Sequence, residues 1–192
     1  KIRFEVDAIM VGITTLLNDN PSLDYTYPSF LSSKLKKKKR YHKVILDPEL
    51  KMPTEGNIWA NKDATVLIVT SDTTSHKKIS KFENLQNCEI VSLKTENGLF
   101  KIEELLKLLF EKDIGILLIE GGSATLTSFW QEKMVDEILL FCSNKILGDN
   151  KGLTSISGGN KTKISESINI DIREFKRFEQ ELMIRGRPCF QE

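Results

Sequence analysis

The sequence predicts an α/β fold with a mostly parallel sheet and an antiparallel hairpin near its end. Short apolar segments alternate with segments of helical period from residue 6 to residue 142, an order typical of parallel strands covered by helices. Four consecutive apolar residues at 116–119 predict a strand buried on both faces of a central sheet. Residues 168–175 and 181–185 are strand-like and are joined by a polar turn at 176–180, which predicts the hairpin.

Each element is predicted by a local pattern. Residues 6–12 form an apolar strand ended by glycine, followed by a short turn or helix at 13–17. Residues 100–112 carry apolar side chains at helical spacing and predict an amphipathic helix. Further strands are expected at 44–47, 64–70, 88–93 and 135–142.

The stretch from residue 115 to residue 126 is the clearest candidate for a binding site. It predicts a strand over 115–120 with Glu120 at its tip, a turn at Gly121 and Gly122, and a helix to about residue 133. Ligands of open α/β folds bind at the carboxyl ends of the strands. Glycine permits a close approach to the backbone, and the helix that Ser123 can cap favours a phosphate. An ordinary strand-to-helix turn is the alternative.

Composition excludes several classes of protein. The 192 residues are 40% hydrophobic and 29% charged, with a net charge of +1, which favours neither nucleic acid nor a membrane surface. Neither a membrane span nor a signal peptide is expected. The three scattered cysteines predict neither a disulfide framework nor a metal site and favour a reducing cytoplasm. The chain begins at Lys1 without Met, so we expect that an N-terminal segment is missing.

Three polar segments have two readings each. Residues 34–43 hold seven Lys or Arg and predict a solvated, mobile loop, with an RNA-binding patch as the alternative. Thr70 and Ser71 begin a cluster of hydroxyls and cations, to residue 78, that suits either a nucleotide ribose or 2′-phosphate, or a helix N-cap. Asp19 lies before Pro21 in a rigid polar loop that can hold a carboxylate against a ligand or form an Asx-turn.

The order of these segments resembles a known family. The resemblance depends on four segments: Asp-Ala-Ile-Met-Val-Gly at 7–12, Thr15 through Asn-Asp-Asn-Pro-Ser-Leu at 18–23, Val-Ile-Leu-Asp at 44–47, and Leu-Ile-Glu-Gly-Gly at 118–122. The series ends with Val-Asp-Glu at 135–137, Gly148 and Gly152. Together they are similar to the reductase domain of the bacterial riboflavin-biosynthesis deaminase-reductase. The similarity covers residues 3–158 well and the terminal hairpin more loosely.

The resemblance implies a dihydrofolate-reductase-like three-layer α/β/α domain that uses NADPH. The family reduces the ribosyl group of 5-amino-6-(5-phosphoribosylamino)uracil to the ribityl form. By position, Arg3, Leu23 and Glu120 match substrate contacts, and Asp19 is a candidate for proton handling. Thr15 and Asp19 also match cofactor-side positions, and residues 122–128 match the segment that lines the nicotinamide and diphosphate. With Gly121 of the glycine turn and the two hydroxyls named above, the expected cofactor contacts are Thr15, Asp19, Thr70, Ser71, Gly121, Gly122, Ser123, Ala124, Thr125 and Leu126.

The chain departs from the family pattern at several places. Thr26 stands where the family has a phosphate-binding arginine, and Pro48 stands where it commonly has serine. The family's first strand and the deaminase domain that often precedes it are absent, so residues 1–192 are read as a reductase domain without them. A homodimer is expected, with a small-molecule substrate and neither nucleic acid nor metal. The alternatives are reduction of the non-deaminated diaminopyrimidine, a Rossmann dehydrogenase, and a non-catalytic nucleotide- or RNA-binding module.

Overall fold

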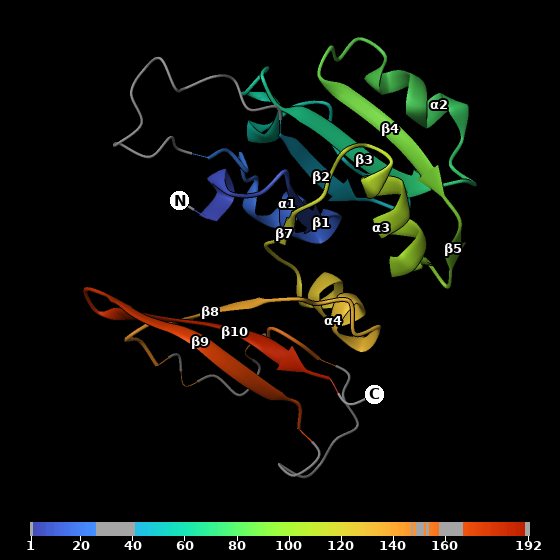
Figure 1. Cartoon of the computed structure of the whole chain (residues 1–192). Coiled ribbons are helices and arrows are strands. Elements are labelled where there is room, and N and C mark those ends of the chain that lie inside the picture. The colour runs from blue at the N-terminus through green and yellow to red at the C-terminus, as the bar shows by residue number, and fades with distance from the viewer. Residues whose placement is uncertain are drawn as a thin grey trace. The chain divides into compact units, whose positions relative to one another are not determined.

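The computed structural model describes residues 2–25, 41–146, 148, 152, 154–157 and 167–190. The chain divides into two compact units, Lys1–Thr125 and Leu126–Glu192, and each is described by itself. The predicted α/β class is confirmed: the first unit contains a parallel sheet with helices, and the second contains an antiparallel hairpin (Figure 1).

The first unit is built on a five-stranded parallel sheet in the order β4-β3-β2-β1-β7. Apolar and β-branched segments form these strands, as expected from their composition. Their bounds are Ala8–Gly12 (β1), His42–Leu46 (β2), Thr65–Ser71 (β3), Cys88–Leu93 (β4) and Leu117–Ile119 (β7). A two-stranded ribbon pairs Thr95–Glu96 (β5) with Leu99–Phe100 (β6). Because all five strands of the main sheet are parallel, their carboxyl ends lie at the same end of the sheet.

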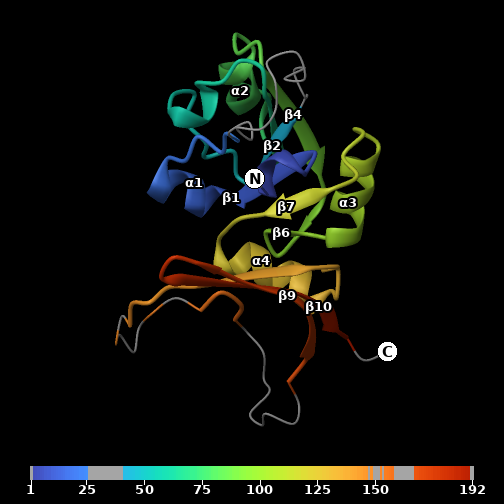
Figure 2. The ribbon, with the colours of Figure 1, turned by 60° about the vertical axis from the view of Figure 1, so that its left-hand side comes forward.

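Helices cover both faces of this sheet. Alternate strand residues such as Ile9, Ile45 and Ile68 pack in one core with Leu16 and Trp59. On this face lie α1 (Ile13–Asp19), α2 (His76–Ile79) and the 3-10 turns η2 (Asn57–Trp59) and η3 (Ser80–Phe82). The amphipathic α3 (Ile102–Phe110) lies on the opposite side of the sheet from α1 (Figure 2). A further 3-10 turn, η1 (Ile2–Phe4), precedes β1.

The second unit holds an antiparallel sheet in the order β8-β10-β9. Its strands are Ile138–Cys142 (β8), Asn169–Phe178 (β9) and Glu181–Cys189 (β10). The last two form the predicted hairpin, with longer strands and a tighter turn than expected, and a register shift between Arg185 and Gly186. A Cβ at Gly186 would stand 2.5 Å from Ile170 Cγ2, which explains why glycine occupies the bulge. The helix α4 (Ser123–Gln131) connects the two units in sequence.

Two expectations about elements were wrong. The strand predicted at 115–120 is the short β7, and among the described strands it pairs only with β1, at the edge of the sheet. Its residues are therefore only partly buried, and Ile116 is exposed. The basic run also does not remain solvated to its end, because Tyr41 and Lys43 are buried as the chain enters β2. Residues 26–40, including Thr26 and the run from Lys34 to Arg40, lie outside the described residues.

Candidate functional site

The candidate site lies where β1 and β7 end side by side. Met10 pairs with Ile119, and the Glu120 backbone N–H donates to the Met10 carbonyl at 3.0 Å. This register places Glu120 and the two glycines after it beside the end of β1 and the start of α1. The polar residues that follow these two strands therefore meet at the carboxyl ends of the strands, as the sequence predicted.

Arg3 and Glu120 form a two-point ion pair. Arg3 Nε donates to Glu120 Oε1 at 2.7 Å, and Nη2 donates to Oε2 at 2.5 Å. A third bond runs from Arg3 Nη1 to the Asp24 carbonyl at 2.8 Å. The hydrogen bond to Glu120 raises the pKa of Arg3, while partial burial opposes it. Both side chains remain partly open to solvent, so they can accept a ligand at their outer faces. The structure thus brings together two residues that the sequence assigned separately to substrate.

The glycine doublet packs against the first turn of α1. Gly121 and Gly122 have φ of 156° and 77°, values that side-chain-bearing residues rarely adopt. A Cβ at Gly122 would stand 3.1 Å from Thr15 Oγ1, and one at Gly121 would stand 3.2 Å from Thr15 Cγ2. A Cβ at Gly12 would stand 2.8 Å from Thr125 Oγ1. Only glycine at these positions lets α1, β1 and the start of α4 approach so closely.

This packing forms a candidate anion cradle at the start of α4. A Cβ at Gly122 would stand 3.1 Å from Thr15 Oγ1 and 3.7 Å from Thr125 Oγ1, so both hydroxyls lie beside the residue that precedes the helix. The positive end of a helix dipole favours a phosphate. Ser123 is the first helical residue and Gly122 stands at the cap position, one residue earlier than expected. Leu126 follows in the same helix but begins the second unit.

Asp19 and Leu23 lie on either side of the turn that follows α1. Asp19 is exposed at the last residue of α1, four positions after Thr15 and therefore on the same helix face, about 6 Å along the axis. Leu23 is only 2% exposed and belongs to the core cluster. Its side chain is therefore part of the core, and the substrate contact expected for Leu23 stays a prediction.

Asn20 ends α1 in a left-handed conformation, and Pro21 after it disfavours continuation of the right-handed helix. Its side chain does not form an Asx-turn with its own segment. Asn20 Oδ1 instead accepts from the Asn57 N–H at 3.0 Å, and the Asn57 side chain donates back to the Asn20 carbonyl at 3.0 Å. This pair holds the 20–24 segment against η2.

A polar cluster around Asp24, with the buried Tyr41 and Lys43, was not predicted from sequence. Asp24 Oδ1 accepts from Lys43 Nζ at 2.8 Å, from Tyr41 Oη at 2.7 Å and from Asn61 Nδ2 at 3.2 Å. Burial raises the pKa of Asp24, but these hydrogen bonds outweigh it and hold that pKa below its ordinary value. Burial also lowers the pKa of Lys43, against the attraction of Asp24. Burial and the nearby carboxylate raise the pKa of Tyr41, which remains a protonated donor.

The position of Lys43 within its strand could have revealed this cluster. Lys43 lies two residues before Ile45 in β2, so the two side chains point to the same face of the sheet, where Ile45 packs in the core with α1. A lysine at an inward-facing strand position needs a buried partner. The basic run that precedes it concealed this signal, because a lysine at the end of a charged loop is usually solvated.

Thr70 and Ser71 lie at the end of β3, and their hydroxyls are bonded within the protein. Thr70 Oγ1 pairs with Thr74 Oγ1 at 2.9 Å, and Ser71 Oγ pairs with Thr73 Oγ1 at 2.8 Å. Both residues are buried, and Ser75 stands at the cap position of α2. The structure does not bring these two hydroxyls to the Arg3–Glu120 pair. Their assignment to cofactor binding stays a prediction.

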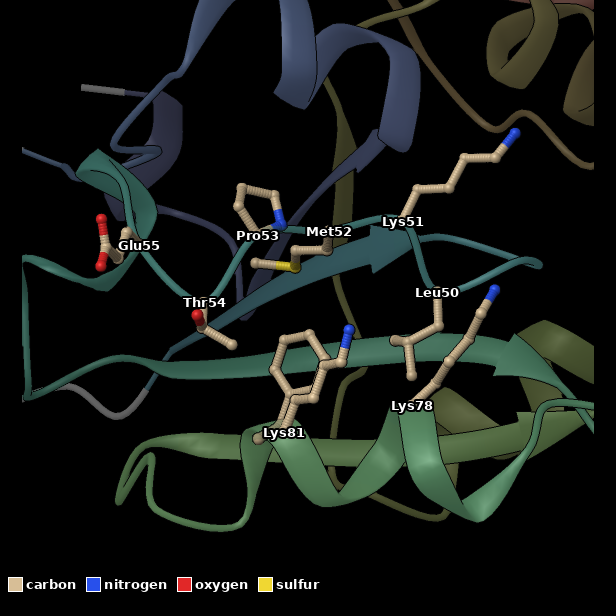
Figure 3. Close-up of a pocket in the computed structure, with 9 residues that line it drawn as sticks. Leu50, Lys51, Met52, Pro53, Thr54, Glu55, Lys78 and Lys81 are labelled. Carbon is tan, nitrogen blue, oxygen red and sulfur yellow. The ribbon is translucent and has the colours of Figure 1, made fainter.

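A separate cavity of about 320 Å³ lies between residues 50–55 and the α2–η3 segment (Figure 3). Leu50, Met52 and Phe82 contribute apolar walls, and three lysines line it. Two of these lysines are bonded to Glu49: Lys51 Nζ lies 2.8 Å from its carboxylate, and Lys78 donates to its carbonyl. None of the residues predicted to bind substrate or cofactor lines this cavity.

The described residues form neither a metal-binding group nor a membrane-spanning helix. No group of three or more His, Cys, Asp or Glu side chains in this part of the chain is placed to hold a metal ion. Among the described helices, none combines the length and apolar character that crossing a bilayer requires.

Comparison with known proteins gives consistent matches. Residues 1–184 match the family described as the RibD C-terminal domain. The chain is 30% identical over 183 residues to riboflavin biosynthesis protein RibD of Aquifex aeolicus. This match covers 95% of this chain and 47% of that protein. It is 28% identical over 192 residues to the 2,5-diamino-6-ribosylamino-4(3H)-pyrimidinone 5′-phosphate reductase of the same organism, covering 100% of this chain and 78% of that one.

Solved structures agree on the fold. A Thermotoga maritima diaminohydroxyphosphoribosylaminopyrimidine deaminase/5-amino-6-(5-phosphoribosylamino)uracil reductase superposes with a TM-score of 0.72 at 26% identity, over 98% of this chain and 47% of that one. RibD of Acinetobacter baumannii gives a TM-score of 0.79 at 18% identity, over 97% and 48%. The chain thus spans about half the length of several relatives that it matches.

Proposed function

This chain belongs to the RibD C-terminal domain family, and from that premise we propose that it is an NADPH-dependent reductase of riboflavin biosynthesis. The proposed reaction converts the ribosyl group of 5-amino-6-(5-phosphoribosylamino)uracil into the ribityl form. The names of the relatives support a pyrimidine reductase. The proposal is more specific than these names in two respects: it gives NADPH as the cofactor and the deaminated pyrimidine as the substrate.

One observation carries the proposal: Glu120, which pairs with Arg3, directly precedes the glycine doublet that packs on Thr15. A charged pair that can bind the polar groups of a sugar phosphate therefore stands next to a cradle suited to a dinucleotide. Among the described residues, three of the five N–H groups of Arg3 bond to Glu120 and Asp24, and we propose that the other two donate to substrate oxygens.

We propose that this cradle binds the diphosphate of a pyridine dinucleotide. Thr15 and Thr125 can donate hydroxyl hydrogen bonds beside the start of α4, where the positive end of the helix dipole favours a phosphate. When bound, NADPH would supply the hydride, and the chain would supply placement and the exclusion of water. Thr15, Gly121, Gly122 and the first turn of α4 are the residues that we propose hold it.

Asp19 is the proposed proton-handling group. It lies on the same face of α1 as Thr15 and is exposed, so it can pass a proton to a reacting atom directly or through water. The Asp19→Asn variant tests this role, with Asp113→Asn, an exposed aspartate in the turn after α3, as the matched control. A fall in kcat for Asp19→Asn alone supports it, and unchanged turnover would remove Asp19 from the chemistry.

Assembly and context are also proposed. We propose a homodimer, a cytoplasmic location and, in the intact protein, covalent linkage to a deaminase domain. The half-length match to RibD relatives supports the linkage. Analytical ultracentrifugation of the chain tests the dimer, and a concentration-independent monomer would contradict it.

The direct test is a reductase assay with the purified chain. NADPH or NADH is mixed with 5-amino-6-(5-phosphoribosylamino)uracil or with its non-deaminated diaminopyrimidinone counterpart. We expect loss of the reduced nicotinamide absorbance with NADPH and the uracil form, and a product heavier by two hydrogens in mass spectrometry. Turnover of the diaminopyrimidinone instead would reassign the substrate. If NADPH is oxidised in the presence of neither the uracil form nor the diaminopyrimidinone, the proposed reductase activity is contradicted.

A further inference from the structure

Lys43 is a cation enclosed in the core of the first unit. It is 0% exposed, and its Nζ lies 2.8 Å from Asp24 Oδ1 and 3.0 Å from the Ile58 carbonyl. Burying an ammonium group is unfavourable unless it is paired and hydrogen-bonded, and removing one partner of such a pair is strongly destabilising. A purely structural role would be met by an apolar residue, since replacing both members of a buried pair is often neutral.

Lys43 is connected to the candidate substrate site through one residue. The Asp24 carboxylate binds Lys43, while its carbonyl accepts from Arg3 Nη1 at 2.8 Å. Arg3 in turn holds both oxygens of Glu120. A continuous series of hydrogen bonds therefore runs from β2 through Asp24 and Arg3 to the end of β7.

The segment that carries Asp24 needs an anchor. Asn20 and Leu23 both have positive φ, 43° and 52°, a conformation that costs an L-residue about 1 kcal/mol or more. Asn57 holds the segment at Asn20, and Lys43 with Tyr41 holds it at Asp24. Without the second anchor the backbone can relax, and the Asp24 carbonyl then leaves Arg3.

Charge gives Lys43 a second effect on the site. The Asp24 carboxylate acts on Arg3 electrostatically and is partly exposed. An unpaired carboxylate there would repel a phosphorylated substrate that approaches Arg3. Lys43 neutralises it from below without occupying the surface.

We propose that Lys43 is a positioning residue for substrate, which fixes the Arg3–Glu120 pair through Asp24 and cancels the Asp24 charge beneath an anionic ligand. The inference rests on the proposed reductase function and extends it to a residue outside the predicted site. It predicts that substrate binding depends on Lys43 while cofactor binding does not.

The kinetic test compares two lysines of the same unit. Lys43→Met should raise the KM for 5-amino-6-(5-phosphoribosylamino)uracil about tenfold or more and leave the KM for NADPH within about twofold. The double variant Lys43→Met with Asp24→Asn removes both charges and keeps acceptors for Tyr41 and Asn61, so the substrate KM should return to within about threefold of wild type. Lys112→Met, which breaks the Lys112–Glu89 pair, should change neither KM.

A second readout does not need turnover. The Arg3 Nε–H signal in a nitrogen-15 NMR spectrum, assigned by its loss in Arg3→Lys, should be protected from exchange in wild type and in Lys112→Met, and lose that protection in Lys43→Met. If Lys43→Met lowers Tm but leaves this signal and the substrate KM unchanged, the inference is overturned. If the wild-type chain reduces no pyrimidine, the proposed function fails, and the Arg3 signal still decides the positioning role.

Folding failure of Lys43→Met would not end the test. Tyr41→Phe removes one donor to Asp24 and leaves every charge in place. It should weaken protection of the Arg3 signal and raise the substrate KM about twofold to threefold, as expected for one net hydrogen bond. No change in either quantity would count against the proposal.

Discussion

Arg3 and Glu120, separated by 117 positions in the sequence, meet through two parallel hydrogen bonds of 2.7 and 2.5 Å. The fork of the guanidinium matches the two carboxylate oxygens, a geometry that lysine cannot reproduce. The pair fixes the direction of both side chains before any ligand arrives. A ligand at this edge of the sheet therefore meets a preorganised site.

Glu120→Gln should lower kcat/KM about tenfold to a hundredfold. The amide keeps the shape of the side chain, but its NH₂ group faces an N–H of Arg3, so one charge-assisted hydrogen bond is lost, worth about 1.5–3 kcal/mol. Steady-state kinetics measure the change. Glu89→Gln, in the pair with Lys112, is the control. Equal kinetics for Glu120→Gln and wild type would contradict a substrate role for Glu120.

Gly122→Ala should weaken cofactor binding, whereas Gly98→Ala should not. Both glycines have φ of 77°, so both variants carry the same backbone strain and should lose about 1 kcal/mol of folding stability. The methyl group at Gly122 would stand 3.1 Å from Thr15 Oγ1, while nothing lies within 4 Å of one at Gly98. Calorimetric titration with NADPH separates the two effects. Similar affinity losses in both variants would mean that strain alone, and not the cradle, is responsible.

Cys88 should react slowly with alkylating agents while the other two cysteines react quickly. Burial, with a contribution from Glu89, raises the pKa of Cys88 to about 11, so at about pH 8 only about one thiol in a thousand is the reactive thiolate. Cys142 and Cys189 are exposed. A time course with iodoacetamide and peptide mass spectrometry measures the three rates, and urea should make them similar. Rapid labelling of Cys88 in the folded chain would contradict its burial in β4.

The sequence predicted the position of Glu120 and the glycine doublet in the fold better than it predicted what surrounds them. Glu120, Gly121 and Gly122 follow a strand directly, so local pattern placed them at a sheet edge. The burial of β7 was overestimated because an apolar run does not reveal how many neighbours a strand has. Lys43 was missed because its partner, Asp24, lies in another segment, and pairing across the fold leaves no mark in local composition. The resemblance gives Leu23 as a substrate contact, which stays a prediction, and the structure adds that its side chain lies in the core.

Acidification should remove the stabilising contribution of Asp24. Its pKa lies below the ordinary value of 3.8 in the folded chain, so the folded state binds this proton less tightly than the unfolded state does. The contribution is therefore fully present above about pH 4 and is lost as pH falls through the lower, folded value. Because about a third of the side chain is exposed, solvent screens the interaction, and we expect less than about 1 kcal/mol.

The measurement is Tm against pH for wild type and for Asp24→Asn, which cannot ionise. The Tm advantage of wild type should be a few degrees or less at about pH 6 and should close toward about pH 3, where the carboxylate begins to take up its proton. Asp72→Asn makes the same chemical change at an exposed position and controls for the general effect of losing a carboxylate. A wild-type advantage that stays constant down to about pH 3 would mean that Lys43 and Tyr41 do not stabilise the ionised form of Asp24.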